Sequence, residues 1–270
     1  MKFLLIGDFH GKIPKIKKKH MDFDAILCTG DLAYSDEIRD LIFKNWELLK
    51  EKKIHEIVSK KKYVLMHKKA VNSQDKILNW LNGFNVPVFL ISGNNDYDFY
   101  EVKKLKFFSP ESLNKKVKKR KNIVLLRNKS IFLKNFQILG FSGYRGFNAK
   151  FENNAFLKKN ESWNFRLKKL FKKMDKKCFN VFLAHDPPRG VLDKIKNKKS
   201  PVNGKHIGDE YFERFVKKFQ PELMVCGHMH ENQGKKKLEK TLVINAGYAY
   251  DNHCAFLEVN ENKIKKVEFV

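Results

Sequence analysis

Near its amino end the chain carries the stretch Lys2-Phe3-Leu4-Leu5-Ile6-Gly7-Asp8-Phe9-His10. An apolar run this short, followed by Gly and Asp, predicts a buried β-strand. Side chains two residues apart in an extended chain lie on the same side. The carboxylate of Asp8 and the imidazole of His10 are therefore expected to converge at the carboxyl end of this strand.

The same pattern of a short apolar run followed by polar residues recurs along the chain. Further runs lie at 24–29, 86–92, 180–184, 223–226 and 242–245. Helical patterns separate most of them, which is typical of a largely parallel sheet. The runs within 122–143 and 255–270 are more closely spaced, and this spacing favours antiparallel hairpins.

A long helical stretch separates the second run from the third. Apolar residues follow helical spacing between about 35 and 84, and Ser35 is a candidate N-cap. One crossover helix needs fewer residues, so we predict an insertion of two or three helices. Further helices are expected at about 162–175 and 207–219. The fold class is α/β, and residues 1–270 are expected to form a single domain.

The composition is that of a folded and strongly basic protein. Hydrophobic residues make up 42% of the chain, which excludes a disordered protein, and the formal net charge is +26. Only seven of the 56 cationic residues are Arg, the residue whose planar fork matches phosphate. The charge is therefore explained as well by a lysine-rich solvated surface as by a nucleic-acid partner.

The cysteines indicate a reducing compartment. Cys28 and Cys226 fall within apolar runs and no C-x-x-C spacing occurs, so neither a disulfide framework nor a zinc ribbon is expected. No apolar run approaches the length of about 18 residues that a membrane span needs. The amino-terminal run is also too short for a signal peptide. We therefore expect a cytoplasmic protein that does not span a membrane.

Five strand ends carry side chains that bind metals. Their candidate ligands are Asp8, His10, Asp31, Asn94, His185, His228 and His230. A lone Asp-x-His or His-x-His pair is common without a metal, but chance does not explain all five at strand ends. Oxygen and imidazole donors without thiolate suit Mn, Fe, Co, Ni or Zn. Seven ligands are too many for one ion and suit two ions that share a carboxylate.

In this order the motifs resemble those of the calcineurin-like metallophosphoesterases. That pattern is Asp-x-His, Gly-Asp, Gly-Asn-His-Asp/Glu, a lone His and Gly-His-x-His, and here it spans residues 8 to 230. The resemblance implies a four-layer α/β-β/α sandwich, to which the 35–84 insertion is added. It also implies a hydrolase of phosphate esters that uses a hydroxide bridging two divalent metal ions, of which manganese is favoured.

The resemblance further implies how the two metals divide the ligands. The first would take Asp8, His10, Asp31 and His230. The second would take Asp31, Asn94, His185 and His228, with Asp31 bridging. Two cations about 3.5–4 Å apart can clamp the phosphoryl oxygens during in-line attack.

Two positions depart from the family pattern. Tyr34 replaces the second Asp of Gly-Asp-x-x-Asp, which affects support around the ligands. Asn95 replaces the motif His, which is thought to steady the transition state or protonate the leaving group, and an amide cannot donate a catalytic proton. We therefore expect a phosphodiesterase whose leaving groups depart unprotonated. Alternatively, His206 supplies the acid, unless it is simply an exposed loop residue.

Other residues are candidates for contact with the substrate. Arg189 follows two prolines and is expected either to bind phosphate or to form a surface pair with Asp186 or Glu210. Tyr144 and Arg145 lie in a Gly-flanked turn that could border the pocket.

Two other classes of function stay open from the sequence. Loss of the motif His is also compatible with a catalytically weak scaffold that keeps the same fold. The positive charge is compatible with a nucleic-acid-binding protein or a nuclease, whose affinity would fall steeply with salt. Within the enzyme interpretation, the phosphate-ester substrate ranges from a nucleotide to a nucleic acid. The sequence does not indicate an oligomeric state.

Overall fold

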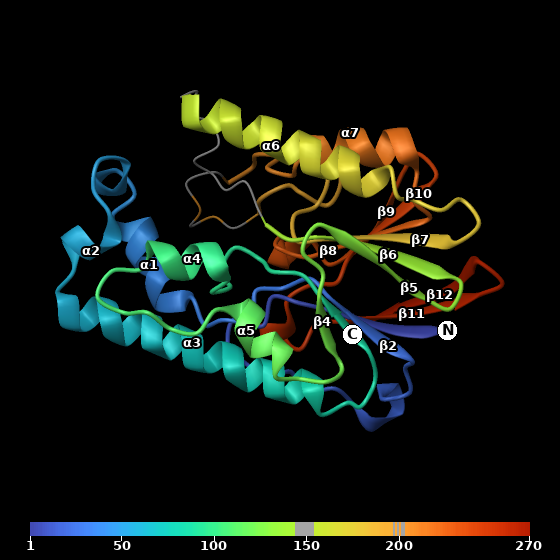
Figure 1. Ribbon diagram of the computed structural model, residues 1–270, viewed down its shortest axis with the longest axis horizontal. Helices are drawn as coiled ribbons and strands as arrows, with labels where there is room; N and C mark the ends of the chain where they lie inside the picture. The colour runs from blue at the N-terminus through green and yellow to red at the C-terminus, as the bar shows by residue number, and fades with distance from the viewer. Residues whose placement is uncertain (144–153, 197, 199, 201–202) are drawn as a thin grey trace.

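Two six-stranded sheets pack face to face, and helices cover their outer faces (Figure 1). The computed structural model describes residues 1–143, 154–196, 198, 200 and 203–270. Helices α6 and α7 lie over one outer face, whereas α3 and α5 lie over the other. The predicted four-layer α/β-β/α arrangement is therefore confirmed.

The first sheet holds the amino-terminal strands and the tail of the chain. Its order is β12-β11-β1-β2-β3-β4, with β1 to β4 parallel, β11 antiparallel to β1, and β12 antiparallel to β11. Its strands are β1 (Lys2–Ile6), β2 (Ala25–Cys28), β3 (Val88–Leu90), β4 (Ile123–Leu125), β11 (Ala255–Asn260) and β12 (Lys263–Phe269). The predicted tail hairpin is confirmed. Glu261 and Asn262 both have positive φ, as a tight primed turn requires.

The second sheet repeats this plan. Its order is β5-β6-β7-β8-β10-β9, with antiparallel strands at both edges of a parallel centre. Its strands are β5 (Lys129–Leu133), β6 (Phe136–Phe141), β7 (Phe179–Ala184), β8 (Leu223–Cys226), β9 (Gly234–Leu238) and β10 (Thr241–Asn245). All residues of β7 and β8 are buried, as expected for strands covered on both faces.

The stretch 122–143 differs in part from its predicted hairpins. β5 and β6 do form an antiparallel hairpin, but β4 pairs in parallel with β3 in the other sheet. The buried Leu126 extends this pairing, because its amide donates to the carbonyl of Leu90 at 2.7 Å. Asn128, with a φ of 54°, then redirects the chain into the second sheet. Close spacing of short runs cannot distinguish a hairpin from such a crossing.

The core between the sheets consists of the inward faces of their strands. Phe3 of β1 meets Phe136 of β6 edge to face, with ring centroids 5.1 Å apart. Separate apolar clusters join each outer face to its helices. These clusters include Leu78 of α3 and Phe212 of α7, both fully buried. This packing holds the two sets of parallel strands in one orientation, so their carboxyl ends lie together.

The predicted helical insertion is present between β2 and β3. It contains α1 (Asp36–Lys44), α2 (Ile54–Ile57) and α3 (Lys60–Asn82). The remaining helices are α4 (Phe99–Lys104), α5 (Leu113–Lys118), α6 (Asn154–Phe171) and α7 (Glu210–Phe219). None of the helices in the described ranges combines the length and apolar character needed to cross a membrane. Ser35 does precede α1, but it makes no side-chain cap to that helix.

Helix α3 also anchors the loop that follows β3. Gln74 of α3 accepts a hydrogen bond from the amide of Tyr97 at 2.9 Å. The Tyr97 hydroxyl lies 2.7 Å from Nδ1 of His67, which is buried on the same helix. Helix α3 of the insertion therefore fixes the carboxyl end of the loop from 93 to 96.

Acid should weaken this anchor. Burial lowers the pKa of His67 from 6.5 to about 4, so the folded protein holds the imidazole neutral. The unfolded chain takes up this proton more readily, so the free energy of unfolding should fall as pH decreases from 6.5 toward 4. Urea denaturation at several pH values, with a chelator present, measures the loss.

The variant His67→Gln isolates this contribution, because it cannot titrate while every other acid-sensitive group is unchanged. The wild type should lose stability relative to the variant as the pH falls. A stability difference that is the same at every pH would contradict the assignment.

Candidate metal centre

The five sequence motifs meet at the carboxyl edge of the two sheets. Three follow β1, β2 and β3 of the first sheet, and two follow β7 and β8 of the second. The structure brings all seven predicted ligands together, in two groups of donor atoms with Asp31 between them.

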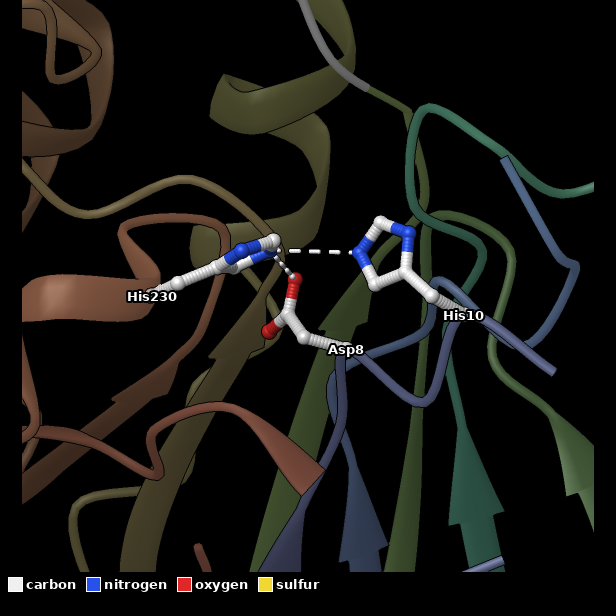
Figure 2. Close-up of side chains that lie close together, drawn as sticks. All are labelled: Asp8, His10 and His230. Carbon is white, nitrogen blue, oxygen red and sulfur yellow. Dashed lines mark hydrogen bonds and ion pairs between the residues drawn. The ribbon is translucent and has the colours of Figure 1, made fainter. Parts of the chain in front are cut away.

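The first group contains Asp8, His10 and His230, whose side chains converge in Figure 2. Nε2 of His230 lies 3.2 Å from Nε2 of His10 and 3.3 Å from Oδ1 of Asp8. Donor atoms bound to one ion at about 2.0–2.2 Å lie roughly 3 Å from one another. The three atoms therefore have the spacing of ligands to a single cation.

The second group lies around His185. Its Nε2 is 2.9 Å from Oδ1 of Asn94 and 3.1 Å from Nδ1 of His228. Asp186 also joins this group, because its Oδ1 lies 3.8 Å from Nε2 of His228. The sequence analysis considered Asp186 only as a surface partner of Arg189 and indicated no role for it at the metal centre.

Asp31 lies between the two groups. Its Oδ2 is 3.7 Å from Nε2 of His10, and its Oδ1 is 3.6 Å from Nε2 of His185. Each oxygen of this buried carboxylate therefore faces a different set of donors. This is the position that a carboxylate shared by two cations requires.

The backbone at these residues differs from the extended chain that the sequence predicted. β1 ends at Ile6, and the φ angles of Asp8 and His10 are 54° and 44°. Asp31 and His228 have positive φ as well, at 53° and 66°. Such angles are uncommon outside glycine and are concentrated at functional sites. Asp8 and His10 therefore converge through a tight turn, not through strand alternation.

Two glycines let the loops after β2 and β3 approach closely. Gly30 has a φ of 90°, and a Cβ there would lie 2.3 Å from the amide nitrogen of Gly93. A Cβ on Gly93 would in turn lie 2.1 Å from Oδ1 of Asp31. A side chain at Gly93 would therefore displace the Asp31 carboxylate, and one at Gly30 would push the two loops apart.

The protonation states suit cation binding. Burial, reinforced by the charge of His230, lowers the pKa of His10 well below its usual value. Burial likewise lowers the pKa of His228 to about 3. Burial opposes ionisation of Asp8, but contact with His230 and the charge of His185 outweigh it and hold its pKa well below its usual range. Neutral His10 and His228 and an ionised Asp8 are thus in the forms that bind metals. His185 differs: burial opposes its protonation, but the charges of Asp31 and Asp8 outweigh burial and raise its pKa to about 9, so a cation there would displace its proton.

The donor set also contains an unsatisfied oxygen. Oδ1 of Asp8 is buried and accepts no hydrogen bond. A buried carboxylate oxygen without a donor is unfavourable unless a cation binds it. The residues present therefore fit a cation between Asp8, His10 and His230.

Neighbouring groups orient the histidines. Nδ1 of His10 lies 2.5 Å from Oγ of Ser35, and Nδ1 of His185 lies 2.8 Å from the carbonyl oxygen of Thr29. Both rings thus direct Nε2 toward the cluster, as in many metal sites. The sequence suggested Ser35 only as a helix cap. Its position directly after Tyr34, which occupies the last position of the Gly-Asp-x-x-Asp pattern, was the available signal for this second role.

Aromatic stacking holds His230. Its ring lies parallel to that of Tyr248, with centroids 3.9 Å apart and planes 8° apart. Tyr248 stacks in turn on Tyr250, at 5.2 Å. Sequence analysis assigned these tyrosines no role at the metal centre, because they lie beyond the last motif and only the fold returns them to it.

Asp96 fixes the backbone around Asp31. It accepts backbone hydrogen bonds from Asp31, Leu32 and Gly93 at 2.8 to 2.9 Å. Burial and the nearby charge of Asp31 raise its pKa to about 7. Asp96 therefore joins the loops after β2 and β3 below the site.

Asn95 lies directly on Asp31. Its backbone amide donates to Oδ1 at 2.8 Å and its side-chain Nδ2 donates to Oδ2 at 2.5 Å. The residue that replaces the motif His thus stays within the cluster but offers an amide donor in place of an imidazole.

The remaining candidates that the structure describes contact residues other than the predicted ligands. Nδ1 of His206 is 2.6 Å from Oδ1 of the buried Asp193, and the histidine side chain is 51% exposed. Arg189 forms the exposed surface pair with Glu210, at 3.5 Å. Tyr34 lies with its ring beneath the Lys69 ammonium group, 4.1 Å from it. Tyr144 and Arg145 lie outside the described residues.

Known proteins are similar to this chain in sequence or in fold. An uncharacterized protein of Methanocaldococcus jannaschii is 24% identical over 249 residues, covering 91% of this chain and 87% of that protein. Human metallophosphoesterase domain-containing protein 1 is 26% identical over 162 residues, which is 58% of this chain and 44% of the human protein. The crystal structure of a dimetal phosphatase from Danio rerio has the same fold, with a TM-score of 0.51 and 11% identity over 97% of this chain and 93% of that one.

The family comparison covers almost the whole chain, from the first strand to the last. The model for the metallophosphoesterases of the calcineurin superfamily matches residues 2–269, which include every motif at the candidate metal centre. The chain therefore belongs to the calcineurin-like metallophosphoesterases, a family of metal-dependent phosphoesterases.

Proposed function

We propose that this protein is a phosphodiesterase that uses two divalent transition-metal ions. The observation that carries the proposal is the position of Asp31, which directs one carboxylate oxygen toward each group of donors. Membership of the family supports hydrolysis of phosphate esters in general. Imidazole and carboxylate donors favour manganese, with iron, cobalt, nickel and zinc as alternatives.

Each ion would be held by residues from both sheets. The proposed ligands are Asp8, His10, Asp31 and His230 for one ion, and Asp31, Asn94, His185 and His228 for the other. When bound, the two ions would activate water and neutralise charge on the phosphoryl oxygens. The negative charge of the buried Asp8 and Asp31 would lower the repulsion between the cations.

Asn95 supports a preference for diesters with good leaving groups. Its amide is bound to Asp31 and has no proton to give to a departing oxygen. An aryl alcoholate (aryloxide) is a weak base and departs without such a proton, whereas a strongly basic, poor leaving group needs an acid. The proposed enzyme therefore releases aryl alcoholates more readily than alkyl alcoholates.

His206 is the proposed acid if one is needed. Asp193 orients its ring through Nδ1. The loop that carries it joins the 3-10 helix at His230–Asn232, because Asn232 donates to the carbonyl of Lys194, the bridge partner of His206. The residue is thus connected to the segment that carries His230.

Arg189 stays a proposed phosphate contact. An exposed pair such as that with Glu210 contributes little, so the guanidinium can leave it for a substrate. The charge of +26 supports an anionic substrate such as a nucleotide or a nucleic acid. The four cysteines are free thiols, which supports the cytosol as the compartment.

Activity toward an aryl phosphodiester should depend on a transition metal. After chelation the protein should be inactive, and Mn²⁺ should restore turnover better than Mg²⁺, because imidazole donors favour transition metals. The corresponding aryl monoester should be hydrolysed more slowly than the diester. Release of the aryl alcohol measures both rates.

Rapid hydrolysis of the monoester would contradict the diesterase assignment and would favour His206 as the acid. Failure of every metal to restore turnover, together with metal binding measured by elemental analysis, would instead favour a scaffold.

His228→Ala should abolish turnover. The ring belongs to the second group of donors, and loss of even an outer partner of a ligand typically lowers metal affinity or activity about 10–100-fold. We expect a decrease of at least roughly 100-fold in kcat/KM. The matched control is His55→Ala in α2, where the imidazole contacts only rings in the described structure. Equal kcat/KM values for the two variants would contradict the proposed metal site.

Asn95→His should shift the preference toward phosphodiesters with poor, alkyl leaving groups. An imidazole at this position can donate a proton to the leaving group, which the amide cannot. The ratio of kcat/KM for an alkyl diester to that for the aryl diester should rise, by roughly 10-fold or more if general acid catalysis is restored. Asn95→Ala is the control, and a similar ratio in both variants would show that proton donation at this position is not limiting.

A further inference from the structure

The first turn of α1 faces the candidate metal centre. Ser35, directly before the helix, contacts His10, and its carbonyl accepts a hydrogen bond from the amide of Arg39 at 2.8 Å. Residues four apart on a helix lie on the same face. Arg39 is therefore one turn above Ser35 on the side of α1 that borders His10.

The guanidinium of Arg39 is held between two partners. Nη2 donates to Oδ1 of Asp36 at 2.9 Å, and the hydroxyl of Tyr248 also interacts with Arg39. Tyr248 is the ring that stacks on His230, and it meets His10 edge to face at 5.4 Å. One side chain thus separates Arg39 from two donors of the first group.

Arg39 still has access to solvent. Its side chain is 39% exposed, and that of Asp36 is 24% exposed. The guanidinium has five N–H groups in a planar fork, so a bond to Asp36 and a contact with Tyr248 leave donors for a further acceptor. Such a fork binds two oxygens of a phosphate at once.

We propose that Arg39 binds a non-bridging oxygen of the substrate phosphate beside the first group of donors, and that Asp36 and Tyr248 position its guanidinium. This inference rests on the proposed function, because the same phosphate would lie against the metal ions. It assigns a role in substrate recognition to the insertion, since α1 supplies the arginine.

A purely structural role for Arg39 accounts for fewer of these contacts. An exposed ion pair three residues apart on a helix stabilises the helix only slightly, and Asp36 alone would satisfy that role. The further contact with Tyr248 is made across the fold, to a segment more than two hundred residues away in sequence. It places positive charge beside the centre, where a phosphate would arrive.

The test is calorimetric titration of inorganic phosphate into manganese-loaded wild type and Arg39→Gln. Loss of a charge-assisted contact should weaken phosphate binding about 10-fold or more, and raise KM for the aryl diester by a similar factor. Manganese content should be unchanged. The matched control is Lys44→Gln, which removes one charge from the same helix roughly 140° around its axis, and it should bind phosphate like the wild type.

Further variants separate the possible roles. Arg39→Lys keeps the charge but loses the fork, and should give an intermediate affinity. Tyr248→Phe keeps the ring on His230 and loses only the hydroxyl, so manganese should stay bound while phosphate binds more weakly. Unchanged phosphate affinity in Arg39→Gln would overturn the proposal. Loss of manganese from that variant would overturn it too, because Arg39 would then act on the metal centre and not on the substrate.

These measurements do not require turnover. If the wild-type protein binds manganese and phosphate but hydrolyses no ester, the proposed function is contradicted. The assignment of Arg39 is then still decided by comparing phosphate binding in the wild type and in Arg39→Gln. Normal turnover with unaffected phosphate binding in Arg39→Gln would contradict only the assignment of Arg39.

Discussion

The carboxylate of Asp31 is the group on which the rest of the site depends. It is almost completely buried, and burial raises its pKa, so its ionised form needs compensation. Asn95 donates to both of its oxygens, and His10 and His185 face one oxygen each. Together with the equally buried Asp8, it concentrates negative charge that only nearby cations can offset well.

Holding that carboxylate requires unusual backbone geometry. Asp8, His10, Asp31 and His228 all have left-handed φ angles, and each follows closely on a buried strand. Strain of this kind persists only where the surrounding structure leaves no alternative. Here the two sheets supply that constraint, because their shared apolar core and outer helices leave the strand ends no freedom to relax.

The insertion between β2 and β3 contributes more than a crossover between parallel strands. The last turns of α3 pack on the sheet, and its middle holds the loop after β3 through Gln74 and His67. Ser35, just before α1, contacts His10, and Arg39 follows in the first turns of that helix. One segment thus supports the donor loops and extends over the centre. That combination explains why this stretch is longer than a single helix.

The sequence by itself determined the buried strands, the insertion, the order of the motifs and the chemistry of the donors, because these depend on local periodicity and residue type. It gave no sign of the lysine-rich edge strand β9. Only the tertiary structure decided that β4 joins the first sheet, that tight turns bring Asp8 and His10 together, and that Tyr248 and Arg39 border the centre. The reason is physical. These features arise from contacts between segments far apart in the chain, and no short-range pattern encodes which distant surfaces will meet.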